Sequence, residues 1–145
     1  MTDVCVAVDI RLVGPADAGL LARVAEDVFD DDINPDLLAA YLADPGHAMA
    51  IALAGGVVVG QARAILNRQP DAPTALFLDN LGVTPAWKRK GVATRLVRAL
   101  MDWGRDRGCA EIWVPVEADN AEATGFYRSL RFTTRPILYV SGAID

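Results

Sequence analysis

The sequence predicts one α/β domain in which a mixed β-sheet carries helices on both faces. Three observations indicate this fold. The chain has 145 residues and is 52% hydrophobic, which suits one sizeable core. Its early apolar segments are joined by turn residues, as in an antiparallel meander. A strand–helix–strand succession over residues 74–116 is typical of a parallel strand pair with a crossover helix.

The first half is expected to form, in order, a strand over 4–13, a helix over 17–29, a shorter helix over 35–42 and a hairpin of strands 49–53 and 57–66. Asp17 is a suitable N-cap, and Pro35 suits a first helical position. Gly55 and Gly56 mark the hairpin turn.

The second half is expected to form a strand over 74–84, a helix over 91–107, a strand over 110–116, a helix over 120–130 and a last strand over 132–140. The helix over 91–107 has the clearest signal, because Val92, Leu96 and Leu100 recur at helical spacing and Gly108 provides a stop.

Charge is unevenly distributed along the chain, whose net charge is −5. Residues 1–87 hold 12 acidic and 4 basic side chains, and residues 88–145 hold 7 acidic and 10 basic ones. A basic half suits a phosphorylated cofactor and an acidic half suits a cationic substrate, with ordinary scatter of surface charge as the alternative. The acidic balance disfavours a nucleic-acid partner.

We expect a cytoplasmic protein without a membrane partner. Met1-Thr2-Asp3 lacks the basic segment of a signal peptide, and no apolar run is long enough to span a bilayer. Cys5 and Cys109 are far apart and form no CxxC pair, which suits a reducing compartment. His47 is the only histidine, so we expect no metal cofactor.

The segment 83–93 is the most informative chemically. A strand ends, a short loop follows, and a helix begins at about Gly91. The first N–H groups of a helix lack partners and lie at the positive end of its dipole, which suits a pyrophosphate. Lys88, Arg89 and Lys90 add positive charge, and Gly91 lets a ligand approach the backbone. A solvated helix cap would show the same pattern.

Two motifs resemble those of the GNAT superfamily of N-acetyltransferases. Val83-x-Pro85 followed by Lys88-x-x-Gly91-x-Ala93 is similar to the acetyl-CoA signature of that family, (Gln/Arg)-x-x-Gly-x-(Gly/Ala). The second cofactor motif of the family resembles Asn120-x-x-Ala123-x-x-Phe126-Tyr127-x-x-Leu130-x-Phe132. The resemblance implies the GNAT fold, in which the parallel strands 74–84 and 110–116 splay apart and acetyl-CoA is the co-substrate.

The resemblance also implies roles for individual residues. Cofactor binding would involve Leu81, Gly82, Val83, Lys88, Arg89, Lys90, Gly91, Val92, Ala93, Thr94 and Asn120. Tyr127 would donate a proton to the departing thiolate, although packing of a half-buried tyrosine is the alternative. Lys88 keeps the charge of the usual residue but not its guanidinium fork. Arg131 replaces a common glycine, so its turn needs φ > 0 or another conformation.

The acceptor amine must lose a proton before it attacks the thioester, so a nearby carboxylate is expected. Glu117 is the first candidate, with a solvated loop carboxylate as the alternative. Asp79 is the second candidate, although strand alternation points it to the wrong face unless a β-bulge intervenes. The family often has an acid where this chain has Asn80.

Within the family, the chain resembles aminoglycoside 3-N-acetyltransferases most, through Phe29-Asp30-Asp31, Asn80-Leu81-Gly82-Val83, Arg89-Lys90-Gly91-Val92-Ala93-Thr94 and Glu117. This resemblance implies an anionic cleft for an aminosugar or polyamine-like small-molecule acceptor. Its substrate-binding residues would be Asp30, Asp31, Asp32, Asn80 and Asp119. A peptide N-acetyltransferase and a non-catalytic acyl-CoA-binding module are the alternatives. By analogy, a homodimer through the late strand around Ile137 to Val140 is also expected.

Overall fold

The structure is a computed structural model that describes residues 7–145 and divides the chain into two units, Met1–Val114 and Pro115–Asp145. The first unit holds a five-stranded sheet of order β1-β2-β3-β4-β5. Residues 4–6 of the predicted first strand, and Cys5 with them, lie outside the described part. None of the helices within residues 7–145 is long and apolar enough to cross a membrane. One domain over 1–145 stays a prediction.

The sheet is mixed, as predicted. Its strands are β1 (Asp9–Leu12), β2 (His47–Ala54), β3 (Val57–Asn67), β4 (Ala75–Val83) and β5 (Glu111–Trp113). The pairs from β1 to β4 are antiparallel, and β4 pairs with β5 in parallel. Gly55 and Gly56 both have positive φ at the β2–β3 turn, which accounts for two consecutive glycines there.

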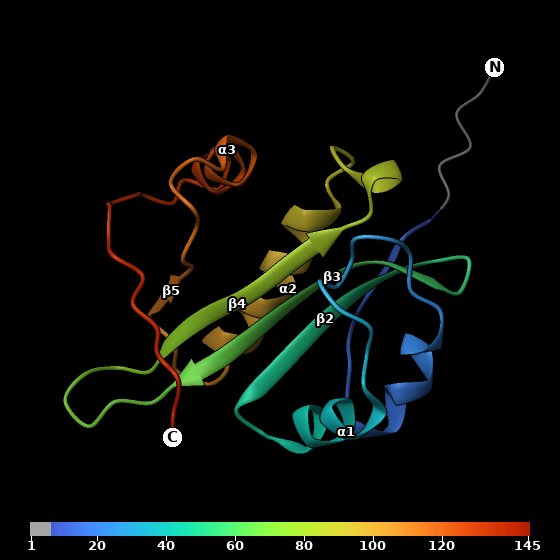
Figure 1. Ribbon diagram of the computed structural model, residues 1–145, viewed down its shortest axis with the longest axis horizontal. Helices are drawn as coiled ribbons and strands as arrows, with labels where there is room; N and C mark the ends of the chain where they lie inside the picture. The colour runs from blue at the N-terminus through green and yellow to red at the C-terminus, as the bar shows by residue number, and fades with distance from the viewer. Residues whose placement is uncertain (1–6) are drawn as a thin grey trace. The chain divides into compact units, whose positions relative to one another are not determined.

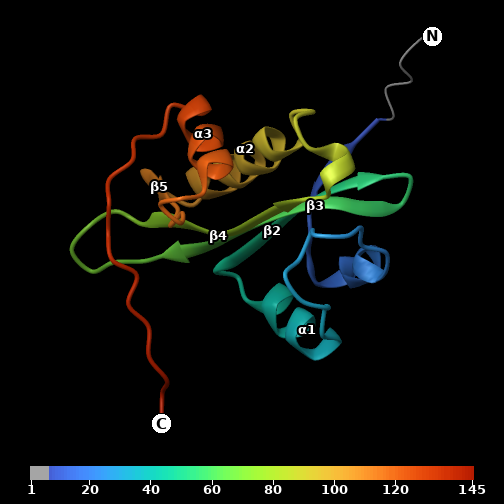
Figure 2. The same ribbon diagram turned by 45° about the horizontal axis from the view of Figure 1, so that its top comes forward.

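Helices lie on both faces of this sheet (Figures 1 and 2). One face is covered by α2 (Val92–Arg105), and the other by the 3-10 helix η1 (Pro15–Ala22) and by α1 (Pro35–Ala43). Neighbouring residues of β3 show the two sides. A Cβ on Gly60 would meet Leu96 of α2 at 3.2 Å, whereas the side chain of Gln61 reaches Val28.

The predicted helix over 17–29 is wrong beyond Ala22, where η1 ends. The chain then pairs with the beginning of β3: the Val58 N–H donates to the Arg23 carbonyl, and the Ala25 N–H donates to the Val58 carbonyl. Backbone groups engaged with a strand cannot also form helical hydrogen bonds. The apolar spacing that indicated a helix instead brings Leu21 and Val28 into the core beside β2 and β3.

The parallel pair is shorter than predicted, because β5 covers only three residues of the expected strand 110–116. These residues pair with Ala75, Leu76 and Phe77, and the Phe77 and Trp113 rings stack with centroids 4.4 Å apart. Within the described first unit, residues 78–83 of β4 therefore have no strand partner on the β5 side. The splay of the two strands that the family resemblance implied stays a prediction.

In the second unit, α3 (Ala121–Ser129) is capped by Asn120, whose side chain accepts from the Ala123 N–H. Arg131 has φ of 67°, one of the two conformations expected where the family has glycine. The predicted strand over 132–140 is wrong. A strand needs a partner for its backbone groups, and Ile137 to Val140 are exposed without one in the described chain, while Pro136 has no N–H to donate.

Candidate active site

The loop between β4 and α2 combines a short 3-10 turn, η2 (Pro85–Trp87), with a left-handed residue at the helix start. Gly91 is the N-cap of α2 with φ of 80°, and it offers no side chain to the first N–H groups. The Arg95 N–H is the first to bond within the helix, to the Gly91 carbonyl at 3.2 Å. The N–H groups of Val92, Ala93 and Thr94 thus lack helical acceptors.

Basic side chains surround these N–H groups. Lys88, Arg89 and Lys90 are exposed, and the Lys90 Nζ lies 5.2 Å from the centre of the Trp87 ring. A Cβ at Gly91 would meet no atom within 4 Å, so glycine is required there by its φ and the space beside it is open. Open backbone donors at a helix N-terminus, together with cations, fit the pyrophosphate of a nucleotide-like co-substrate.

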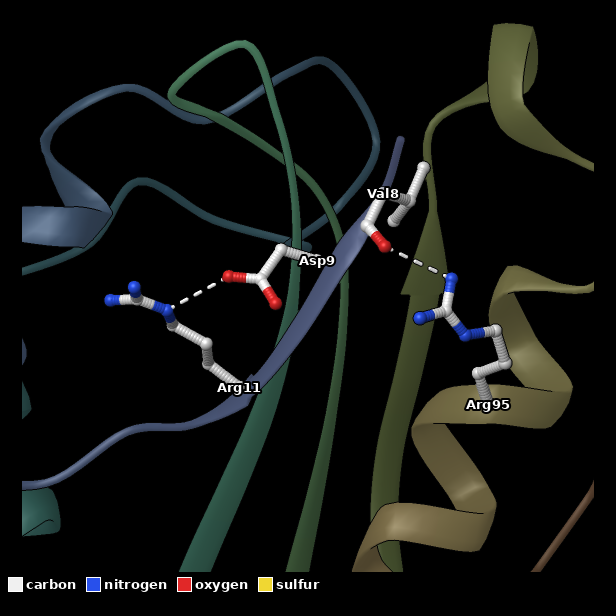
Figure 3. Close-up of polar contacts among 4 residues, drawn as sticks. All are labelled: Val8, Asp9, Arg11 and Arg95. Carbon is white, nitrogen blue, oxygen red and sulfur yellow. Dashed lines mark hydrogen bonds and ion pairs between the residues drawn. The ribbon is translucent and has the colours of Figure 1, made fainter. Parts of the chain in front are cut away.

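The first turn of α2 is also tied to the chain before β1. The Arg95 guanidinium donates a 3.0 Å hydrogen bond to the Val8 carbonyl (Figure 3). The neighbouring ion pair of Arg11 with Asp9 is exposed, and such pairs contribute little to stability. Arg95 therefore has a structural partner in the chain before β1.

β4 has a free edge next to this loop. Leu81 and Val83 pair with Ala62 and Gly60 of β3, and the other side of residues 78–83 has no strand partner in the described first unit. An extended ligand with amide groups, such as a pantetheine arm, can pair with such an edge as an added strand would. The predicted backbone contacts of Leu81, Gly82 and Val83 are compatible with this edge.

A β-bulge interrupts β4 at Asp79. Arg63 pairs with Asn80 and Ala64 pairs with Leu78, which leaves Asp79 as the extra residue. The bulge that Asp79 needed in order to change face is therefore present. Burial raises the pKa of the Tyr41 phenol, and the Asp79 carboxylate adds to that rise. The Asp79 side chain is exposed, and its catalytic role stays a prediction.

Asn80 links the sheet to the loop 24–33, which we call the acidic loop. The Asn80 Nδ2 donates to Asp30 at 3.4 Å, while its Oδ1 accepts from Gln61 at 2.7 Å. Gln61 is fully buried in β3, and its Nε2 also donates to the Val28 carbonyl at 3.0 Å. Asp30 and Asn80, both predicted as substrate residues, are therefore brought together. Gln61 was not predicted, although a glutamine within an apolar strand was a visible signal.

The acidic loop lies very close to β4. A Cβ on Gly82 would lie 2.3 Å from the Val28 carbonyl oxygen, so only glycine fits at position 82 where the acidic loop crosses β4. The Arg63 guanidinium lies over the Phe29 ring, 5.7 Å from its centre. Val28 is buried in the core cluster. These contacts hold the backbone on both sides of Val28 against the sheet.

The same segment encloses a hollow of about 450 Å³. It is lined by Val24, Ala25, Glu26, Asp27, Phe29, Asp30, Asp31, Asp32 and Ile33. Five of these residues are acidic, and this concentration of negative charge attracts a cationic guest. Asp30 is the lining residue that Asn80 holds, and Asp31 and Asp32 are exposed beside it.

The remaining predicted residues, Glu117, Asp119, Asn120 and Tyr127, belong to the second unit. Tyr127 is buried, with Phe126 and Phe132 as ring neighbours at 5.0 and 5.9 Å. Burial raises the pKa of Tyr127 to about 12, so the phenol keeps its proton at neutral pH. The catalytic roles of Glu117 and Tyr127 stay predictions.

No group of three or more His, Cys, Asp and Glu side chains within residues 7–145 is placed to hold a metal ion. Cys109 has a free, partly buried thiol whose pKa is raised by burial. A reaction without a metal stays a prediction.

Comparison with known proteins identifies the family. Residues 20–132 match the acetyltransferase (GNAT) family. An aminoglycoside N(6')-acetyltransferase type 1 of Stenotrophomonas maltophilia is 31% identical over 138 residues, which is 90% of each chain. The N-alpha-acetyltransferase RimI of Mycobacterium tuberculosis is 33% identical over 128 residues, covering 86% of this chain and 78% of RimI.

A solved structure of an acetyltransferase is similar to this chain over nearly its whole length. AAC(6')-Iy in complex with the bisubstrate analogue CoA-S-monomethyl-acetylneamine superposes with a TM-score of 0.76 at 25% identity, covering 94% of this chain and 99% of the other. Closeness to the 3-N type of aminoglycoside enzyme is not shown, since the aminoglycoside relative carries the 6′-N name. The family match covers both cofactor motifs, and the chain belongs to the GNAT family of acetyltransferases.

Proposed function

We propose that this N-acetyltransferase transfers the acetyl group of acetyl-CoA to a primary amine of a small cationic acceptor, an aminoglycoside or a polyamine, in a ternary complex. The observation that carries the proposal is the acidic hollow lined by residues 24–33. Asn80 links this hollow to β4, and β4 leads into the loop with Lys88, Arg89 and Lys90, which we call the basic loop. One strand thus has a region for an anionic ligand at its end and a region for a cationic ligand on its face.

Acetyl-CoA supplies an activated thioester, and the chain's own residues bind and orient it. In the proposal, the N–H groups from Arg89 to Thr94 hold the pyrophosphate, with charge from Lys88 and Lys90. The free edge of β4 pairs with the pantetheine arm through Leu81 to Val83, and Asn120 contacts the same arm. Pairing along a strand places the acetyl carbonyl in one orientation, which lowers the entropic cost of the reaction.

The transfer itself needs three proton movements. A carboxylate, Glu117 or Asp79, takes a proton from the acceptor ammonium. The neutral nitrogen then attacks the thioester carbonyl, so a C–N bond forms and the C–S bond breaks. Tyr127 donates the proton that the thiolate needs, and the second proton of the attacking nitrogen returns to the protein. The products are the amide, free CoA and one released proton.

The relatives support this substrate class and also favour a second one. The Stenotrophomonas maltophilia relative is named for aminoglycosides, which agrees with the five carboxylates of the hollow. RimI is named for an α-amine, and its similarity over 86% of this chain supports a peptide acceptor as the second candidate. Both relatives are named as acetyltransferases, which favours an enzyme over a module that only binds acyl-CoA.

The test is a thiol-release assay with acetyl-CoA against aminoglycosides, polyamines and short peptides. We expect turnover with the cationic small molecules and much weaker turnover with neutral peptides. Turnover confined to peptides would replace the proposed acceptor with the second candidate. No thiol release above the rate without acceptor, with acetyl-CoA bound, would contradict the proposed acceptors altogether.

A further inference from the structure

Gln61 is a polar side chain in the interior of the sheet. Its exposed fraction is 0%, and its neighbours on β3, from Val58 to Ala62, include fully buried apolar residues. Burying an amide is costly unless its groups are hydrogen-bonded. The Gln61 Nε2 makes two hydrogen bonds, while its Oε1 has no partner in the part of the chain that the structure describes. Because burying this amide costs free energy, we infer that its hydrogen bonds have a role that an apolar side chain could not fill.

The two hydrogen bonds of Gln61 fix the orientation of a second amide. The Val28 carbonyl can only accept, so the Gln61 NH₂ group must face it. The other hydrogen of the same NH₂ group then points to the Asn80 Oδ1. Because the oxygen of Asn80 faces Gln61, its own NH₂ group is left to face Asp30. With Asn80 reversed, two oxygens would face each other instead.

Gln61 also holds the chain that carries Asp30. Its bond to the Val28 carbonyl fixes the backbone two residues before Asp30, at the point where that backbone passes over Gly82. Gln61 therefore controls the position of Asp30 by two routes, through the backbone of Val28 and through the side chain of Asn80. None of the carboxylates lining the hollow other than Asp30 has a hydrogen bond of this kind to β4 among the described residues.

We propose that Gln61 is a positioning residue for the acceptor: it orients Asn80 and Val28 so that the Asp30 carboxylate faces the acceptor ammonium from a fixed place beside β4. This inference rests on the proposed function, because it concerns the same acceptor site. The side-chain hydrogen bonds of Gln61 go to Val28 and Asn80, and none of those found among the described residues reaches the loop 84–91 or the first turn of α2, although its backbone pairs with Gly82. Loss of Gln61 should accordingly change the use of one substrate and spare the other.

The first experiment measures both KM values in Gln61→Met, which keeps the length of the side chain but removes its hydrogen bonds. Gln69→Met is the matched control, because Gln69 is an exposed glutamine that bonds only to the Pro73 carbonyl in its own loop. We expect KM for the acceptor to rise roughly tenfold in Gln61→Met with KM for acetyl-CoA nearly unchanged. Gln69→Met should behave as wild type.

A double-mutant cycle then tests whether Gln61 acts through Asp30. Asp30→Asn should raise the acceptor KM by itself, and adding Gln61→Met should cause little further rise, because the carboxylate to be positioned is already gone. In an Asp71→Asn background, where an exposed loop carboxylate is neutralised instead, Gln61→Met should keep its full effect. Additive effects with Asp30→Asn, or equal changes in both KM values, would overturn the proposal. If Gln61→Met does not fold, Asn80→Leu replaces it in the same cycle.

A measurement without substrate separates this proposal from the proposed function. In wild type, Asp30→Asn should shift the side-chain NH₂ signals of Asn80 in a ¹⁵N-resolved NMR spectrum. In the Gln61→Met background the same substitution should leave them nearly unchanged. An equal shift in both backgrounds would show that Gln61 does not orient Asn80. The proposed function fails separately, if wild type releases no thiol with any acceptor while this NMR response is present.

Discussion

The two sides of the candidate site are built in different ways. The proposed acetyl-CoA side is mostly one segment, residues 81–94, with Asn120 as a predicted contact outside it, and its chemistry comes from backbone groups, a left-handed glycine and cations. The proposed acceptor side is assembled from three segments, the loop 24–33, β3 and β4, and its chemistry comes from the amides of Gln61 and Asn80 and from exposed carboxylates. One side is positive and local, and the other is negative and formed by long-range contacts.

This difference determines how each side responds to mutation. Where the backbone binds, most side-chain changes should have small effects, and the sensitive residue is Gly91, whose φ of 80° sets the loop conformation. On the acceptor side, hydrogen bonds link Gln61 to Asn80 and Asn80 to Asp30. Removing any one of these side chains breaks the hydrogen-bonded chain that positions the carboxylate. Substitutions on the two sides should therefore affect the two substrates separately.

The largest effect is expected for a residue that serves neither binding step. Tyr127→Phe removes the phenol proton that the leaving thiolate needs, so kcat should fall roughly 100-fold while acetyl-CoA affinity changes little. Tyr139→Phe, in the exposed segment after Pro136, is the matched control and should keep its activity. Equal kcat values for wild type and Tyr127→Phe would limit Tyr127 to packing.

Tyr127 also predicts a change of stability with pH. Its folded pKa, about 12, lies above the ordinary value of 10.0, so the stabilisation from the protonated phenol is complete below pH 10 and is lost as pH rises through the folded pKa. The free energy of unfolding should fall between pH 9 and pH 11.5 more steeply in wild type than in Tyr127→Phe. Urea denaturation measures this difference, and parallel curves would contradict the burial of the phenol.

The next largest effect concerns the acetyl-CoA side. Gly91→Val forces a branched residue into a left-handed conformation, which costs roughly 2 kcal/mol and should weaken acetyl-CoA binding by roughly 30-fold. Gly108→Val is the control, since Gly108 has φ of 84° at the other end of α2. The control should lose stability and keep its affinity for acetyl-CoA. Equal losses of affinity in the two variants would locate the cofactor elsewhere.

A smaller effect is expected where the acceptor loop crosses β4. Gly82→Ala places a Cβ 2.3 Å from the Val28 carbonyl oxygen, so the loop must shift. Such overpacking costs roughly 1–3 kcal/mol of unfolding free energy, which chemical denaturation measures. Gly125→Ala, where a Cβ meets nothing within 4 Å, should lose no stability and should gain some, because alanine favours the helix α3 more than glycine does. A Gly82→Ala variant of wild-type stability would mean that the loop is not held against the strand.

The strand, loop and helix start that carry the proposed acetyl-CoA side could be predicted from the sequence because their signals are local. An anion site at a helix N-terminus is formed by the loop just before the helix. Its signals, the strand end, the basic residues and Gly91, therefore lie within about ten positions of one another. The same holds for Arg131, where one replaced glycine predicted a positive φ that the structure has. The sheet order and the helices on both faces also followed from apolar spacing and turn residues.

Residues of the acceptor side, such as Asp30 and Asn80, were expected from the family resemblance, but the contacts between them could not be predicted because they join distant residues. Gln61 bonds to Val28 across 33 positions and to Asn80 across 19, and Asn80 meets Asp30 across 50. The helix expected over 17–29 failed for a related reason: backbone pairing of Arg23 and Ala25 with Val58 overrode a helical pattern of apolar residues. Tertiary contacts decided both regions.

The central claim is that the acidic loop binds the acceptor and the basic loop binds acetyl-CoA. It is tested most directly by the triple substitution of Asp30, Asp31 and Asp32 to asparagine, with both KM values measured for a cationic acceptor that wild type uses. We expect KM for the acceptor to rise at least roughly tenfold and KM for acetyl-CoA to stay unchanged. An unchanged acceptor KM, or a rise confined to acetyl-CoA, would contradict it.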